Sequence, residues 1–314
     1  MVCEGMKSTF ISAADGLEIS YLETAPEGTP KGIVQLVHGM CEHKERYLPL
    51  MDFLNRRGYV CVINDHRGHG ESVREPEDLG YFYEGGAEGL VEDVHQLLVM
   101  TREKYGRELP YTLLGHSMGS FAVRVFLKEH DADIDRLIVM GSPSPLAASG
   151  AGLVLCRLIG KMKGDRGHSA LLDTLVMDSQ YEKRFAREHT RHSWISSDRA
   201  VVEAYNKDPL CSFTFTVSGY EQLIRLMQET YSPQGWLLHH PDLPILFLSG
   251  KEDPCAVSPK AFGRAVKFLR QTGYRQVTGY MYPGMRHEIL NEKEKARVYH
   301  DIIRFLEGQQ PAEA

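Results

Sequence analysis

Five short and nearly continuous apolar runs recur along the chain, each bounded by Gly, Pro or polar residues. They occupy residues 32–38, 59–63, 111–114, 137–140 and 245–248. Runs of this length and continuity are typical of strands buried on both faces of a parallel sheet. Between them, at 48–57 and 90–101, apolar side chains recur every three or four residues, which predicts amphipathic helices. This alternation predicts a doubly wound, mostly parallel α/β sheet.

The two ends of the chain extend this sheet. Asp15-Gly16 separates residues 8–13 from 17–24 and favours a tight turn, so the sheet is predicted to begin with antiparallel strands. After the last apolar run, the pattern predicts elements in the order helix, strand, helix at residues 259–269, 276–282 and 296–306. The sheet is therefore expected to be mixed.

The alternation fails between residues 143 and 238, where helical stretches such as 200–204 and 220–227 follow one another without a buried strand. We interpret this segment as an inserted helical cap. The predicted organisation is a first core part at 1–142, the cap at 143–238 and a second core part at 239–314.

Composition and charge narrow the class of protein. The chain has 314 residues, 42% of them hydrophobic and 25% charged, which is typical of a folded globular protein. A net charge of -6 argues against a general nucleic-acid binder, which needs a surplus of Lys and Arg. The six cysteines are scattered without a CxxC pair, the first ten residues lack a secretory signal, and no apolar stretch approaches the roughly 20 residues that span a bilayer. We expect a cytoplasmic protein.

The sequence Gly115-His116-Ser117-Met118-Gly119 directly follows an expected strand and opens an expected helix near Phe121. Gly-x-Ser-x-Gly in this context is the nucleophile elbow, a turn so tight that the flanking glycines have no room for side chains. The alternative, a glycine-rich connection with a solvated serine, is disfavoured by this position. Ser117 is therefore the predicted nucleophile.

A serine hydroxyl needs a base and an acid, which follow it in this type of fold in the order Ser, Asp, His. Asp253 lies after the strand at 245–248, and His287 lies after the strand at 276–282. Glu252 and Glu288 are rival acids, but Glu288 adjoins the base and is badly placed to reach its Nδ1. We favour Asp253 as the acid and His287 as the base.

Acyl transfer also needs amide donors for the oxyanion. The N–H of Met118 follows the nucleophile, and the N–H of Met40 follows His38-Gly39 at the end of an earlier strand. His66 and His69 are interpreted as bracing the loop that follows residues 59–63 rather than as metal ligands. We predict no metal and no cofactor.

These residues together resemble the α/β-hydrolase superfamily, and within it the monoacylglycerol lipase and lysophospholipase group, also labelled serine aminopeptidase-like. His38-Gly39-Met40 with Glu42-His43 resembles that group's oxyanion loop, residues 65–70 its D-x-RGHG strand end, and residues 115–119 its GHSMG elbow. Residues 206–210 resemble its DPL segment. The resemblance covers nearly the whole chain and implies a serine esterase with Ser117, Asp253 and His287 as its triad.

The cap holds an apolar segment, residues 146–159, that is followed by basic side chains. Its apolar members include Leu153, Val154, Leu155, Leu158 and Ile159, and Lys161, Lys163 and Arg166 follow. Such a helix is expected to pack over an apolar pocket. Transient contact with a membrane surface is the alternative.

The leading hypothesis is a serine carboxylester hydrolase that acts on a small lipid ester such as a monoacylglycerol or a lysophospholipid. An aminopeptidase is the second hypothesis. It would need an acidic anchor in the cap, for which Glu203 and Glu221 are available. A non-catalytic ligand receptor on the same fold is the third, and the complete set of triad residues argues against it.

Overall fold

The structure, a computed structural model, describes residues 5–145 and 148–309, without the side chains of 177–180. Cys3, the rest of the first four residues and the start of the apolar cap segment at Leu146 lie outside the described residues.

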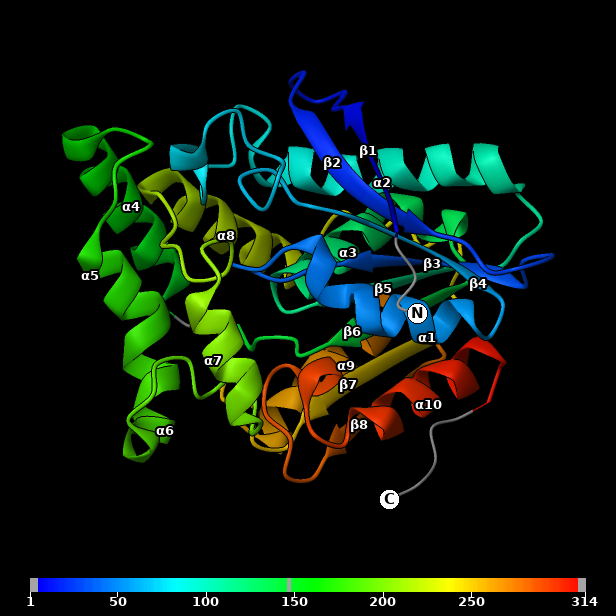
Figure 1. The fold of residues 1–314 in the computed structure, drawn as a ribbon. Coiled ribbons are helices and arrows are strands. Elements are labelled where there is room, and N and C mark those ends of the chain that lie inside the picture. The colour runs from blue at the N-terminus through cyan, green and yellow to red at the C-terminus, as the bar shows by residue number, and fades with distance from the viewer. Residues whose placement is uncertain (1–4, 146–147, 310–314) are drawn as a thin grey trace.

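The core is a mixed sheet of eight strands in the order β1-β2-β4-β3-β5-β6-β7-β8 (Figure 1). The strands are β1 Met6–Ile11, β2 Glu18–Thr24, β3 Gly32–Val37, β4 Tyr59–Asn64, β5 Tyr111–His116, β6 Arg136–Met140, β7 Ile245–Gly250 and β8 Val277–Tyr282. β1 pairs with β2, and β2 with β4, in antiparallel fashion, whereas every later pair is parallel. The predicted antiparallel start and parallel remainder are confirmed.

Helices cover both faces of this sheet, which explains why the strands are apolar on both sides. In β3, Ile33 and Val37 belong to the core on one face, and Val34 and Leu36 belong to the core on the other. The first face carries α2 Gly86–Tyr105, α3 Met118–His130 and α9 Pro259–Thr272, and the second carries α1 Leu48–Asn55 and α10 Lys295–Leu306. The helix expected near Phe121 begins at Met118, because the turn at Ser117 leads directly into it.

Between β6 and β7 the chain forms helices, which gather beyond one end of the sheet (Figure 1). They are α4 Ser149–Lys163, α5 Ala170–Asp173, the π-helical η4 Thr174–Glu182, α6 Lys183–Phe185, η5 Ala186–Glu188, α7 Arg199–Lys207 and α8 Val217–Thr230. Within the described part of this segment, β structure is limited to an isolated bridge between His168 and Thr216. The short 3-10 helices elsewhere are η1 Lys44–Tyr47, η2 Pro76–Asp78, η3 Asp131–Asp133 and η6 Ile289–Asn291.

Candidate active site

Ser117 occupies a sharp turn between β5 and α3. Its φ of 53° and ψ of -116° lie in a region that residues other than glycine rarely adopt. The flanking glycines make this turn sterically feasible. A Cβ on Gly119 would lie 2.1 Å from the carbonyl oxygen of Val37, and one on Gly115 would lie 2.5 Å from the carbonyl oxygen of Gly119. The turn holds the half-buried Ser117 at the carboxyl edge of the sheet.

Asp253 and His287 follow the neighbouring strands β7 and β8 and lie in contact. Nδ1 of His287 is 3.0 Å from Oδ1 and 3.1 Å from Oδ2 of Asp253. The carboxylate also accepts hydrogen bonds from the backbone N–H of Cys255 (2.8 Å) and the hydroxyl of Ser249 (3.1 Å). Burial alone would raise the pKa of Asp253, but His287 and these donors outweigh burial and hold it below its ordinary value. Asp253 is thus kept as a carboxylate.

The rival acids are placed elsewhere. Glu252 is exposed. Glu288 is buried but accepts two hydrogen bonds from the guanidinium of Arg46, at 2.7 and 2.6 Å. Nε2 of His287, the nitrogen opposite Asp253, is buried and has no hydrogen-bond partner among the described residues.

The loop after β3 packs directly against the serine turn. A Cβ on Gly39 would lie 2.6 Å from Oε1 of Glu42 and 3.0 Å from Cβ of Ser117, so only glycine allows this approach. Gly39 donates its N–H to Oε1 of Glu42 at 2.5 Å, which fixes the loop. Met40 and Met118, whose N–H groups are the predicted oxyanion donors, line the same cavity as Ser117.

Glu42, which the sequence places in the resembled oxyanion loop, has partners that only the structure reveals. Besides Gly39, it accepts hydrogen bonds from Nδ1 of His116 (2.9 Å), the hydroxyl of Tyr47 (3.1 Å) and Arg46 (3.0 Å). Burial would raise the pKa of Glu42, but His116 and Arg46 hold it well below its ordinary value. Burial would likewise lower the pKa of His116, yet its bond to Glu42 raises it. The pair is therefore a buried ion pair beneath the loop.

One cavity joins these groups. Its lining combines the serine turn, the loop after β3, the His287 loop and side chains from residues 143–238. The residues are Met40, Glu42, His116, Ser117, Met118, Phe121, Pro143, Ser144, Val176, Tyr181, Trp194, Ile195, Tyr205, Leu223, Ile224, Met227, Cys255, His287 and Glu288. The cavity is polar around Ser117 and His287 and apolar toward α8.

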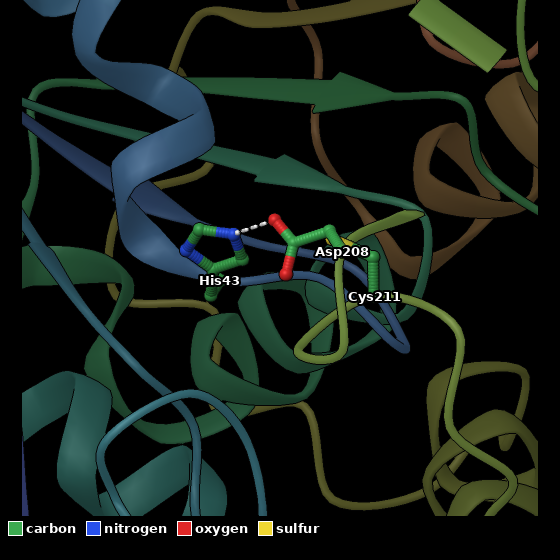
Figure 2. A group of neighbouring side chains, drawn as sticks. All are labelled: His43, Asp208 and Cys211. Carbon is green, nitrogen blue, oxygen red and sulfur yellow. Dashed lines mark hydrogen bonds and ion pairs between the residues drawn. The ribbon is translucent and has the colours of Figure 1, made fainter. Parts of the chain in front are cut away.

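His43, Asp208 and Cys211 form a second cluster, where the loop after β3 meets the segment that follows α7 (Figure 2). These residue types can hold a metal ion, but here they bond to one another and to neighbours. Nε2 of His43 lies 3.0 Å from Oδ2 of Asp208, and its Nδ1 lies 2.7 Å from Oε2 of Glu45. Burial would lower the pKa of His43, but the two carboxylates raise it. The cluster acts as an ion-pair link between the loop and the helical segment.

The predicted bracing role of His66 is visible in its contacts with His38. The backbone N–H of His66 donates to Nε2 of His38 at 2.9 Å, and Nε2 of His66 lies 3.0 Å from the carbonyl oxygen of His38. Burial is the main cause that lowers the pKa of His66 to about 3 and that of His69 to about 4. Both rings are therefore neutral near pH 7.

Comparisons with known proteins identify the family. Residues 28–294 match the family described as serine aminopeptidase, S33. The chain belongs to this family. It is 25% identical to a monoacylglycerol lipase of Mycolicibacterium smegmatis over 306 residues, covering 98% of this chain and 99% of the relative. It is 27% identical to a monoglyceride lipase of Rattus norvegicus over 291 residues, covering 92% and 86%.

Solved structures agree with this placement. A thermostable carboxyl esterase from Bacillus coagulans, in complex with glycerol, superposes with a TM-score of 0.88 at 29% identity and covers 97% of this chain and 98% of its own. A monoglyceride lipase from Saccharomyces cerevisiae shares the fold, with a TM-score of 0.71 at 21% identity over 100% and 97% of the chains. The predicted α/β-hydrolase of the monoacylglycerol lipase and lysophospholipase group is confirmed, and the protein is a lipase-like hydrolase.

Among the described residues, none of the helices is both long enough and apolar enough to cross a membrane.

Proposed function

We propose that this protein is a serine carboxylester hydrolase that acts on a lipid ester such as a monoacylglycerol or a lysophospholipid, through Ser117, His287 and Asp253. The observation that carries the proposal is the Asp253–His287 pair, whose Nε2 is unpaired among the described residues, in the cavity that Ser117 also lines. That nitrogen is the one a neighbouring hydroxyl would use as its base.

The proposed reaction follows from these positions. Nε2 of His287 takes the proton of Ser117 as Oγ attacks the ester carbonyl, while Asp253 holds the ring and stabilises the imidazolium. The N–H groups of Met40 and Met118 donate to the oxyanion. His287 then gives the proton to the leaving alcohol, and water releases the acid from the acyl-enzyme by the same route.

The lining supports a lipid rather than a peptide. Phe121, Val176, Leu223, Ile224 and Met227 provide an apolar side for an acyl chain. The relatives from Mycolicibacterium smegmatis and Rattus norvegicus are named monoacylglycerol lipase and monoglyceride lipase. These names indicate that the substrates of those proteins are lipid esters, in agreement with this preference.

An aminopeptidase needs an acid that remains available for the substrate's ammonium group. The two glutamates of the lining, Glu42 and Glu288, are neutralised by His116 and Arg46. The acids considered from the sequence are paired as well. Glu203 lies 2.8 Å from Arg199, and Glu221 lies 2.6 Å from Arg225. We therefore favour an ester hydrolase over an aminopeptidase.

We further propose that residues 143–238 act as the cap of this site and touch lipid surfaces transiently through α4. Leu153, Leu155 and Ile159 pack inward against the core, whereas Val154, Leu158 and Met162 are 55%, 55% and 85% exposed. The α4 helix thus has apolar side chains both on the side that faces the core and on the side that faces solvent. A cytoplasmic location stays a prediction.

The test is a hydrolysis screen over acyl esters and aminoacyl arylamides, combined with labelling by a fluorophosphonate probe. We expect ester turnover and labelling, both abolished in Ser117→Ala, a variant that loses one oxygen and keeps the fold. Labelling without ester turnover would reject the lipid-ester assignment, and wild-type esterase activity in Ser117→Ala would reject the nucleophile. A non-catalytic receptor would show neither labelling nor turnover.

A further inference from the structure

Trp194 contributes its indole ring to the cavity from the segment that precedes α7. The side chain is buried, with 6% of the residue exposed, and it lines the same cavity as Ser117 and His287. Its ring centroid lies 5.1 Å from that of His287 and 5.1 Å from that of Tyr181. Trp194 is thus a neighbour of the proposed base.

The indole N–H of Trp194 is buried and has no hydrogen-bond acceptor among the described residues. Buried indole N–H groups usually find a partner, because leaving one unpaired costs free energy. The other tryptophan follows this rule, since Nε1 of Trp236 donates to the carbonyl oxygen of Ser232 at 2.9 Å. Because Trp194 lines the cavity, a molecule bound there is a candidate for the missing acceptor.

The backbone around Trp194 is fastened to the His287 loop. Ile195 accepts a hydrogen bond from the N–H of Glu288 at 2.7 Å, and the carbonyl oxygens of Ser193 and Ser196 accept from the guanidinium of Arg286. Trp194 and His287 are therefore held in fixed relative positions. A donor positioned in advance loses little entropy when it binds its acceptor.

The chemistry of His287 identifies which part of the substrate lies here. In ester hydrolysis the base hands its proton to the oxygen of the leaving alcohol, so that alcohol must lie beside Nε2 of His287. A substrate with its alcohol at Nε2 of His287 would therefore lie next to the indole of Trp194, which packs against the same ring and lines the same cavity. The alcohol of a monoacylglycerol or of a lysophospholipid is a glycerol unit that carries at least one free hydroxyl.

We propose that Trp194 is a specificity-determining residue whose indole N–H donates a hydrogen bond to a free hydroxyl oxygen of the substrate's glycerol part. The inference rests on the proposed esterase function and adds to it the recognition of the alcohol. A site built to bond a hydroxyl discriminates against an analogue that lacks it, because its own buried donor is then left unpaired.

The experiment compares two esters with one acyl chain and a three-carbon alcohol, 1-monolauroylglycerol and propyl laurate, below the concentrations at which they aggregate. The wild-type protein should prefer monolauroylglycerol. Trp194→Phe, which keeps an aromatic ring and removes the N–H, should lower kcat/KM for monolauroylglycerol about threefold to tenfold more than for propyl laurate. Lysophosphatidylcholine with the same acyl chain and one free hydroxyl should follow monolauroylglycerol.

The ratio between the substrates separates recognition from packing, because a loss of packing affects both esters alike. Equal losses for the two esters, or a wild-type protein without preference, would overturn the proposal while leaving ester hydrolysis intact. Absence of turnover for every ester would instead reject the proposed function. Trp236→Phe is the matched control and should leave the ratio unchanged.

A binding measurement covers the case in which Trp194→Phe fails to fold. The chain has two tryptophans, so Trp236→Phe leaves Trp194 as the sole indole. In that protein, with Ser117→Ala added to prevent turnover, monolauroylglycerol should shift the indole emission to longer wavelength, and propyl laurate should not. Identical spectra with the two esters would contradict the proposed hydrogen bond.

Discussion

Replacing Arg286 with Met should lower kcat, although Arg286 is not among the described residues that line the cavity. Arg286 donates from Nη1 to the carbonyl oxygens of Ser193 (2.5 Å) and Ser196 (3.2 Å), and its guanidinium lies 4.1 Å from the ring centroid of Phe185. It also pairs with Glu188. Because His287 is the next residue, these contacts hold the proposed base to the helical segment.

The size of the effect follows from the bonds that are lost. A hydrogen bond from a charged donor contributes about 1.5 to 3 kcal/mol, so two carbonyl contacts amount to about 3 to 6 kcal/mol. The pair with Glu188 adds little, because that carboxylate is half exposed. At about 1.5 °C per kcal/mol for a chain of 314 residues, Tm should fall by about 5 to 9 °C. A displacement of His287 by about 1 Å should lower kcat about 100-fold, with a small change in KM.

The assay measures kcat and KM on a soluble ester together with Tm by calorimetry. Arg286→Lys retains the charge but cannot reproduce the planar fork, so it should recover part of the loss. Arg275→Met is the matched control. Arg275 is exposed, and among the described residues its guanidinium pairs only with Asp242. A lower Tm with unchanged kcat would refute the reasoning, since the contacts would then support the fold without positioning His287.

Three further predictions concern the acid, the acyl chain and the His43 cluster. Asp253→Asn should lower kcat by about 10³-fold to 10⁴-fold because the amide favours the wrong histidine tautomer, whereas Glu252→Gln should match the wild type in the same kinetic assay. In a series of glyceryl esters, kcat/KM should rise up to about fourfold per added methylene and level off where the cavity ends; a flat series would contradict an acyl pocket. The pKa of His43 is higher in the folded protein than in the unfolded chain, where it is about 6.5. Protonated His43 therefore stabilises the fold fully below about pH 6.5, and this contribution is lost as the pH rises through the pKa of His43 in the folded protein. The Tm difference between the wild type and His43→Gln should therefore shrink as the pH rises above about 6.5, and a difference independent of pH would contradict this assignment.

The sequence predicts the elements whose patterns are local. Buried strands are short apolar runs between turns, and the elbow is marked by glycines two positions before and after Ser117. Both signals are imposed by immediate neighbours. Asp253 and His287 could be predicted as well, because each follows a recognisable strand and the carboxyl ends of parallel strands meet at one edge.

The residues that the sequence did not reveal are defined by distant partners. The loop motif marks Glu42 in the sequence, but its partners Gly39, His116 and Arg46 are known only from the fold. The short helices α5, η4 and α6 lack a long periodic pattern, so their bounds could not be predicted from the chain alone. Trp194 shows an unpaired N–H only when its tertiary surroundings are known.

The contacts divide the helical segment into two parts with different attachments. At its carboxyl half, Asp208 is bonded to His43 beside the Met40 loop, and Ser193 and Ser196 are bonded to Arg286 beside His287. This half is therefore fastened to both loops that the proposed chemistry requires, and a large movement there would disturb the oxyanion donors and the base together. The α4 helix contacts α8 and exposes an apolar stripe. We expect lipid to enter beside α4, which exposes this apolar stripe and makes no hydrogen bond or ion pair with the His287 loop among the described residues.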